Sequence, residues 1–421
     1  MKRTEILKAL KANKNINGYE LICTNKDSRE LFYVLDHLEI NRAVNTIKQV
    51  ATIYVNTKDK TGTSTVTITA ADDEKSLTKK INEAVKKAKA ALNEYYPLAS
   101  KSKNINDVKE IKYDLNDIAS NVAKAVFKAD TYINGWLNST EIFVSNIIKE
   151  FDNSNGVHHK ENNFEIKVEV IPTWKGEKEE VELYKFYESG KIDYKQITLE
   201  IKQLLLNAKL RSEAKTLKDV KIDSDTLVLV QNDMLDTILD NLCANASYQY
   251  NFLKMNHYNV KDLVSNNPFT LTLKGKVKGC INSSSFDNNG IVLKSKTIIK
   301  DGILKNIFGS IRFGYYLKQK NITGSLTVAV LDGKRYNYKK EKHLIIENFS
   351  SPQLDESSGY WGGEVRLARY FDGEKYIPLT GFSISGNIYE DIKEVKFSKE
   401  DCQMSSYVGP KYFIFKGIQI H

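Results

Sequence analysis

Three aspartates and one cysteine recur at helical spacing in a single segment. Asp233, Asp236 and Asp240 lie three and four residues apart, and Cys243 follows three residues later. Carboxylates on one face of a helix could bind a cation together with ligands from elsewhere in the chain. We favour the alternative, a solvated acidic face near the N-terminal end of a helix, where the helix dipole stabilises negative charge. The leucines beside Cys243 predict a buried, unreactive thiol.

The six histidines form no pattern that could hold a zinc ion. His158 and His159 are the only close pair, and adjacent side chains diverge on a helix and point to opposite faces of a strand. The polar residues 152–156 before this pair predict a surface loop. The sequence also lacks a P-loop, a GxGxxG turn and a GxSxG elbow. We therefore expect no catalytic residue, no metal ligand and no cofactor site.

A polar and aromatic loop is the strongest candidate for binding. Residues 355–363 read DESSGYWGG and precede a predicted strand. Backbone groups in such a segment could pair with an extended peptide while an aromatic ring packs against it. The alternative is a tight turn around one buried aromatic side chain. The predicted substrate-binding residues are Asp355, Glu356, Ser357, Tyr360 and Trp361.

The elements that must position these residues change in character near the middle of the chain. A chain of 421 residues is long enough for two domains. The polar, aperiodic residues 216–225 predict a boundary that separates residues 1–220 from 221–421. The first part mixes helical and strand periods, which predicts an antiparallel or mixed sheet with helices on one side. The second part has many glycines and short alternating segments, which predicts a β-rich domain. The expected fold class is α+β.

Periodicity predicts the main elements of the first part. Helices are expected over 29–47, 76–95, 115–129 and 194–215, and a β-hairpin over 49–56 and 64–70. Residues 164–172 form the clearest strand, with Glu165, Lys167 and Glu169 opposite an apolar face. In the second part, a strand over 226–231 leads into a helix that runs from Asp233 to about residue 252. That helix carries the three aspartates.

Composition argues against several classes of function. Lysine and arginine outnumber acidic residues by 62 to 53, a formal net charge of +9. The basic residues are nearly all lysines interleaved with acidic ones, which favours a solvated surface over a nucleic-acid site. No apolar run is long enough to span a membrane, and the start lacks a secretory signal. Four separated cysteines without a CxxC pair favour the reducing cytoplasm.

Short motifs follow one another in a distinctive order from about residue 279 to the end. They are SSFDNNGI at 284–291, IIKDGIL at 298–304, Thr323-Gly324, FSISGN at 382–387 and GPKYFIF at 409–415. In this order they resemble the TldD/PmbA family, once described as modulators of DNA gyrase. The resemblance implies an α+β chain with a β-rich C-terminal domain. It also implies dimers that enclose a cavity, in which a metal-bearing subunit hydrolyses unfolded peptides.

The chain departs from the metal-bearing pattern that this resemblance implies. Metal-bearing TldD-like members carry HExxxH on the helix after the strand at 226–231, whereas here that helix contains no histidine. Zinc hydrolysis needs neutral nitrogen or thiolate ligands and a carboxylate base. The resemblance therefore implies a PmbA/TldE-like, non-catalytic subunit that pairs with an HExxxH-bearing subunit or with itself. The alternative is a stand-alone homodimer that binds a peptide or another ligand without cleaving it.

Overall fold

The computed structural model describes residues 1–421 except 102, 110–112 and 178. The N-terminal half is built on one nine-stranded sheet with the order β4-β3-β2-β1-β6-β7-β5, while β8 and β9 also pair with β7. All of its pairs are antiparallel except β5 with β7. The sheet is therefore mixed. Its strands are β1 (Gly18–Val34), β2 (His37–Asn56), β3 (Lys60–Ile68), β4 (Leu92–Glu94), β5 (Asn106–Asp107), β6 (Gly135–Asn153), β7 (His158–Lys175), β8 (Glu180–Glu182) and β9 (Lys185–Ser189).

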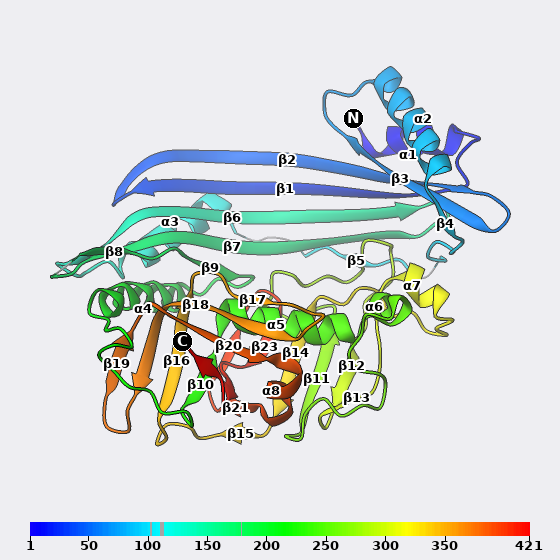
Figure 1. Ribbon diagram of the computed structural model, residues 1–421. Helices are drawn as coiled ribbons and strands as arrows, with labels where there is room; N and C mark the ends of the chain where they lie inside the picture. The colour runs from blue at the N-terminus through cyan, green and yellow to red at the C-terminus, as the bar shows by residue number, and fades with distance from the viewer. Residues whose placement is uncertain (102, 110–112, 178) are drawn as a thin grey trace.

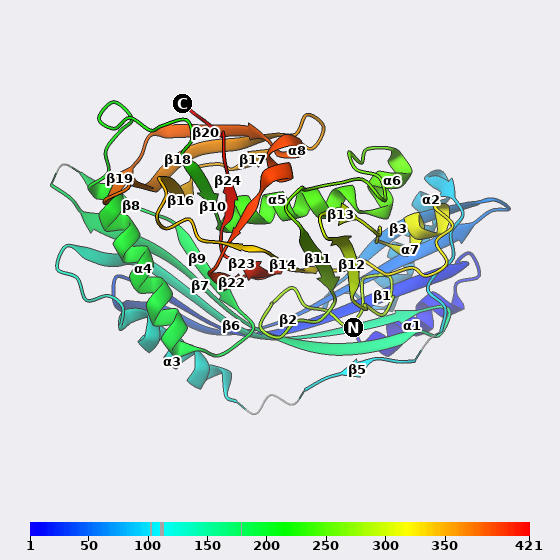
Figure 2. The same cartoon turned by 90° about the horizontal axis from the view of Figure 1, so that it is seen from below.

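Helices cover one face of this sheet at both ends. Near one end, α1 (Arg3–Ala12) and α2 (Glu74–Ala90) bury Ile6, Leu10, Leu77 and Ile81 against β1, β2 and β3. Near the other end, α3 (Leu115–Phe127) and α4 (Tyr194–Ser212) share a second core with β6 and β7. The apolar stripes of these helices bury the sheet face that they cover. Figure 2 shows the long strands as an arc around the C-terminal half, with α3 on the outer side.

The first long hairpin replaces the helix predicted over 29–47. Residues 29–34 continue β1, and 37–47 begin β2, in one ladder that pairs Gly18 with Tyr54 and Val34 with His37. The turn between them places Leu35 at a φ of 55°. Leucine seldom adopts this left-handed conformation, so the turn lacks the glycine or asparagine that marks most hairpins in a sequence. The predicted strands at 49–56 and 64–70 are found in β2 and β3.

Two further sheets make up most of the C-terminal half. The ten-stranded sheet has the order β15-β21-β24-β10-β16-β18-β20-β25, with β17 and β19 at β18, and the six-stranded sheet has the order β13-β12-β11-β14-β23-β22. The strands are β10 (Leu227–Val230), β11 (Phe269–Lys274), β12 (Lys296–Lys300), β13 (Ile303–Leu304), β14 (Val328–Gly333), β15 (Arg335–Tyr336), β16 (His343–Phe349), β17 (Gln353–Leu354), β18 (Tyr360–Phe371), β19 (Tyr376–Leu379), β20 (Phe382–Asn387), β21 (Lys396–Ser398), β22 (Asp401–Gln403), β23 (Tyr407–Pro410), β24 (Phe413–Phe415) and β25 (Gln419–Ile420).

Short helices accompany these sheets. They are α5 (Asn232–Asn245), α6 (Tyr248–Leu253), α7 (Ile311–Tyr316), α8 (Ile388–Asp391) and the 3-10 turn η1 (Ile392–Glu394). Helix α5 lies on the side of the C-terminal half that faces the N-terminal sheet (Figure 1). The single helix predicted from Asp233 to about residue 252 is in fact two, because the chain bends between α5 and α6.

The α+β class, with a mixed N-terminal sheet and a β-rich C-terminal half, is confirmed. Within the described residues, no helix combines the length and apolar character needed to cross a membrane. The predicted domain boundary near residue 220 stays a prediction, although β10 begins just after it.

Candidate functional site

Helix α5 has one apolar face and one acidic face. Its buried residues pack into the main C-terminal core and include Met234, Leu235, Ile238, Leu239 and Leu242. The opposite side carries Asp233, Asp236 and Asp240. This is the amphipathic spacing that the sequence predicts. Helix α5 faces the N-terminal sheet (Figure 1), and the charge of Glu188 on β9 of that sheet acts on Asp236.

The three aspartates differ in their electrostatic environment. Asp233 and Asp240 are exposed, as predicted for a solvated face, whereas Asp236 is only partly exposed. Burial raises the pKa of Asp236 to about 7, and the neighbouring charges of Asp240, Asp233 and Glu188 contribute further. Burial also raises the pKa of Asp240, and repulsion from the Glu356 carboxylate raises it further. The acidic face thus extends from Glu188 on β9 to Glu356 in the 355–359 loop.

The thiols near this face are poor ligands. Cys243 packs against the C-terminal core, and burial raises the pKa of its thiol to about 12. Burial also raises the pKa of Cys402, in the middle of β22, to about 12. Both thiols stay protonated at neutral pH, whereas zinc takes thiolate. The described residues contain no group of three or more His, Cys, Asp or Glu that could hold a metal ion. The donors present do not fit the metal that the family resemblance associates with this helix.

The loop at 355–359 lies beside α5 and forms a tight turn. The Asp355 carboxylate accepts hydrogen bonds from the backbone N–H and hydroxyl groups of Ser357 and Ser358, at 2.7 to 3.0 Å. These donors lower the pKa of Asp355 to about 2. Glu356 accepts a hydrogen bond from Tyr250 of α6. The structure therefore brings Glu356 close to Asp240 of α5, while Asp355 and Ser357 hold the turn that carries Glu356.

The two predicted aromatic residues have different surroundings. Tyr360 is 49% exposed, so its ring is available to a ligand. Trp361 is fully buried, its ring lies 5.1 Å from that of Phe415, and its indole N–H donates to Asp391 at 2.7 Å. Trp361 thus anchors the turn in the core, which is the arrangement expected of a tight turn around one buried aromatic side chain. The role of the loop in binding stays a prediction.

The sheet face opposite α5 carries paired charges and aromatic rings. We call it the inner face, because its residues Glu20 and Glu161 contact the C-terminal half. Its ion pairs join Lys26 to Glu165 at 2.8 Å, Arg42 to Glu30 at 2.6 Å and Lys167 to Glu188 at 2.9 Å. Glu188 also accepts a hydrogen bond from Ser405. The partly exposed rings of Phe32 and Phe143 meet edge to face at 5.7 Å.

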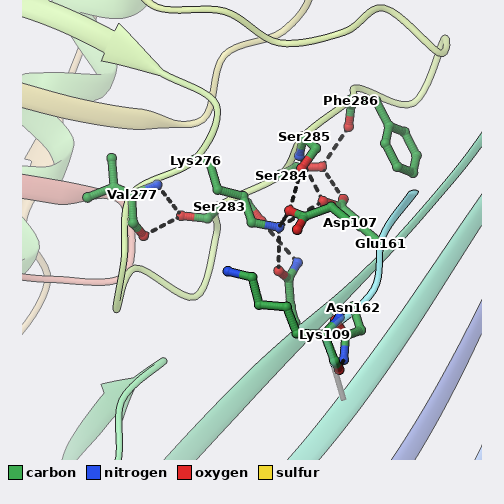
Figure 3. Close-up of polar contacts among 11 residues, drawn as sticks. Asp107, Lys109, Glu161, Asn162, Lys276, Val277, Ser283, Ser284, Ser285 and Phe286 are labelled. Carbon is green, nitrogen blue, oxygen red and sulfur yellow. Dashed lines mark hydrogen bonds and ion pairs between the residues drawn. The ribbon is translucent and has the colours of Figure 1, made fainter. Parts of the chain in front are cut away.

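A polar cluster around the buried Glu161 fixes the inner face against the C-terminal half (Figure 3). Glu161 of β7 is fully buried and accepts from the backbone N–H of Ser285 at 2.8 Å and from the Ser284 hydroxyl. The Lys276 ammonium lies 3.2 Å from Glu161 and 2.9 Å from Asp107 of β5. We call these five residues the clamp. It joins two strands of the sheet to the loop that carries the SSFDNNGI motif.

The same motif makes a second anchor. Glu20 accepts hydrogen bonds from Tyr54 at 2.7 Å and from the Asn289 amide. Gly290 has a φ of +76°, and a Cβ there would lie 2.2 Å from the ring of Phe151. This position therefore requires glycine. The His159 side chain accepts from the backbone N–H of residue 105, so its other ring nitrogen donates to the Gly290 carbonyl at 3.1 Å.

The surroundings of His159 correct the surface-loop prediction for the histidine pair. Both histidines lie in β7, and His159 is fully buried. The turn occupies 153–156 instead. The charged side of residues 164–172 indicated one polar face of this strand, which is part of the inner face. The contacts of Glu161 with Ser284 and of Glu188 with Ser405 join residues more than 100 positions apart. Periodicity alone could not predict them.

Comparisons with known proteins agree with this architecture. Residues 224–421 match the family model of the PmbA/TldA metallopeptidase C-terminal domain. No curated protein matches the sequence. TldE from Thermococcus kodakarensis is 14% identical, with a TM-score of 0.80 and 99% of both chains covered. A putative modulator of DNA gyrase from Bacteroides thetaiotaomicron is 15% identical, with a TM-score of 0.79 and coverage of 99% of this chain and 98% of that one. One from Thermotoga maritima is 12% identical, with a TM-score of 0.76 and 96% of both chains covered.

Proposed function

The chain belongs to the TldD/PmbA family, and we propose that it is a PmbA/TldE-like, non-catalytic subunit of a cytoplasmic metallopeptidase complex. In this proposal an HExxxH-bearing subunit supplies the metal and the general base. The present chain completes the enclosed chamber and holds an unfolded peptide in extended form.

The chemistry of α5 carries the proposal. The helix that the resemblance associates with HExxxH presents aspartates and one protonated thiol. In such motifs two neutral nitrogen ligands hold the zinc ion. Aspartates with a raised pKa, such as Asp236, are poor replacements for them, because they are partly protonated at neutral pH. The remaining features suit a chamber wall. Helix α5 lies on the side of the C-terminal half that faces the N-terminal sheet (Figure 1), and the clamp holds these two parts together.

Metal content and peptide hydrolysis test this proposal. The purified chain alone should contain no stoichiometric zinc and cleave no unfolded peptide. Co-expressed with an HExxxH-bearing family member from the same genome, it should co-purify with that subunit, and the pair should cleave peptides in a chelator-sensitive manner. A partner in which glutamine replaces the HExxxH glutamate is the matched control, because it should bind this chain and cleave nothing. One zinc per chain with chelator-sensitive cleavage by this chain alone would contradict the proposal.

The 355–359 loop supplies a prediction for peptide binding. Tyr360→Ala should change the free energy of unfolding by no more than about 0.5 kcal/mol, because the side chain is half exposed. The same change should weaken the binding of an extended peptide to the complex, measured by fluorescence anisotropy. Tyr315, which is 44% exposed on α7, offers the control in Tyr315→Ala. Equal peptide affinity for both variants would remove the loop from the binding surface.

A second candidate function is a stand-alone homodimer that binds peptide without cleaving it. Strand β2 favours it. Among the described residues, no strand pairs with residues 37–48 of β2 on the side away from β1, and this edge offers a surface for a second copy. In this case the chain should bind peptide by itself and should not bind the HExxxH-bearing subunit.

A further inference from the structure

One line of side chains on the inner face combines aromatic rings with two carboxylates. The register of the sheet pairs Phe186 of β9 with Glu169 of β7, and Glu169 with Glu141 of β6. Glu141 in turn pairs with Phe32 of β1. Directly paired side chains point to the same face of a sheet. These four residues, which we call the row, therefore cross four strands in the order ring, carboxylate, carboxylate, ring.

The two carboxylates of the row have no cation of their own. Like charges directly opposite each other destabilise a pair of strands, and the pKa of Glu141 is raised by burial and by the charge of Glu169. Within the described part of the chain, no ion pair includes either carboxylate. The neighbouring carboxylates of the inner face each have a cation, and these are Glu30, Glu165 and Glu188. The row therefore offers negative charge that a ligand can neutralise.

Aromatic rings beside these carboxylates are open to solvent. Phe186 is 53% exposed, and Tyr184, whose hydroxyl donates to Glu169 at 3.0 Å, is 59% exposed. Phe32 is partly exposed at the other end of the row. Large exposed rings that gather on one surface indicate a site of interaction, and the faces of such rings attract cations. The rings and the carboxylates thus favour the same class of ligand, a cation on an apolar stem.

The row adjoins the acidic face of α5. Glu188 lies two residues beyond Phe186 on β9, about 7 Å along the strand. The charge of Glu188 acts on Asp236 of α5, and its side chain accepts a hydrogen bond from Ser405 of the C-terminal half. Figures 1 and 2 both show β9 between β7 and the C-terminal half. An extended peptide beside α5 can therefore place one of its side chains over the row.

We propose that the row binds an arginine side chain of this peptide, with the guanidinium between Glu141 and Glu169 and the stem against Phe186. The Cβ atoms of directly opposed residues lie about 4.5–5.5 Å apart. One planar guanidinium can therefore donate to both carboxylates and stack on a ring, whereas the ammonium of lysine is a compact point charge. This inference rests on the proposed function, because it names the class of peptide that the chamber holds.

Peptides that differ in one charge test the row. Short labelled peptides of glycine, serine and threonine would contain either one arginine or one citrulline, which has nearly the same shape without the charge. The complex with the glutamine-bearing partner cleaves nothing, so it suits a binding titration. In fluorescence anisotropy it should bind the arginine peptide about tenfold more tightly, the factor expected of one charge-assisted hydrogen bond. A lysine peptide should have an intermediate affinity.

Two double variants assign this preference to the row. Glu141→Gln combined with Glu169→Gln should remove the preference for arginine and leave the affinity for the citrulline peptide unchanged. Glu83→Gln combined with Glu374→Gln is the matched control, because it removes two exposed carboxylates elsewhere and changes the net charge equally. The control should keep the preference. Without peptide, Glu141→Gln alone should raise the Tm, because it relieves the repulsion by Glu169.

The outcomes distinguish this inference from the proposed function. Equal affinities for the arginine and citrulline peptides, or a preference that survives in the variant with both row carboxylates replaced, would overturn the inference alone. So would a lysine peptide that binds more tightly than the arginine peptide. Failure of the two subunits to co-purify would contradict the proposed function, and the same titration with this chain alone would then decide on the row. Absence of binding by either peptide, to the complex and to the chain alone, would overturn both.

Discussion

Lys276→Met should lower the free energy of unfolding by about 2 kcal/mol, between the values for exposed and buried ion pairs, because Lys276 is exposed and Glu161 is buried. The change keeps the length of the side chain but leaves Glu161, whose side chain is 1% exposed, without its cation. Removing the cation leaves the buried Glu161 carboxylate poorly compensated, and a buried charge without its partner costs more than the pair contributed. Asp107 loses the same cation but is better solvated. Chemical denaturation, followed by tryptophan fluorescence, would measure the loss.

Two further variants separate charge from packing in the clamp. Lys393→Met is the control, because Lys393 pairs with the exposed Glu390 and such surface pairs contribute about 0–1 kcal/mol. Glu161→Gln combined with Lys276→Met should recover at least half of the loss, because the uncompensated charge is gone. The amide oxygen can still accept from the Ser285 N–H, and the amide NH2 can donate to the Ser284 hydroxyl oxygen, which donates to the Phe286 carbonyl. A double variant no more stable than Lys276→Met would show that packing, and not charge, dominates the clamp.

The regular parts of the fold follow from periodicity. The predicted helices at 76–95, 115–129 and 194–215 correspond to α2, α3 and α4, whose apolar stripes are buried as expected. Strand β7 likewise shows the alternation read from residues 164–172. The first hairpin could not be predicted in this way. Its leucine-rich segment fits a helical period as well as a strand, and the left-handed Leu35 gives no turn signal.

The candidate site is less visible in the sequence than the fold, because tertiary contacts create it. The acidic spacing on α5 and the turn at 355–359 could be predicted from local patterns. The raised pKa of Asp236 depends on burial and on Glu188, which reaches α5 from another sheet. His159 was misplaced because the contact that buries it, with the Gly290 carbonyl, crosses between the two halves of the chain. Local sequence patterns predict the helix or strand that carries a side chain, but not the part of the chain that packs against that side chain.

Stability should fall as the pH rises from about 4.5 to 7, and Glu20 should account for much of the fall. Burial raises the pKa of Glu20 from 4.5 to about 7, against the opposing hydrogen bonds from Tyr54 and Asn289. Between these values the folded chain holds a proton that the unfolded chain releases, so stability declines as pH increases. The stabilisation is fully present below pH 4.5 and is lost above pH 7. A pKa difference of this size between the folded and unfolded chain corresponds to about 3 kcal/mol in the free energy of unfolding.

Glu20→Gln isolates this contribution, because glutamine stays neutral and fills the same space. The variant should lose most of the decline in unfolding free energy between pH 4.5 and 7, and should be more stable than the unmodified chain at pH 8. Glu83→Gln, on the exposed side of α2, should leave the pH profile unchanged. Asp236, whose pKa is also about 7, should supply the residual slope in Glu20→Gln. Identical profiles for Glu20→Gln and the unmodified chain would mean that Glu20 is charged in the folded state, with the Tyr54 and Asn289 hydrogen bonds outweighing its burial.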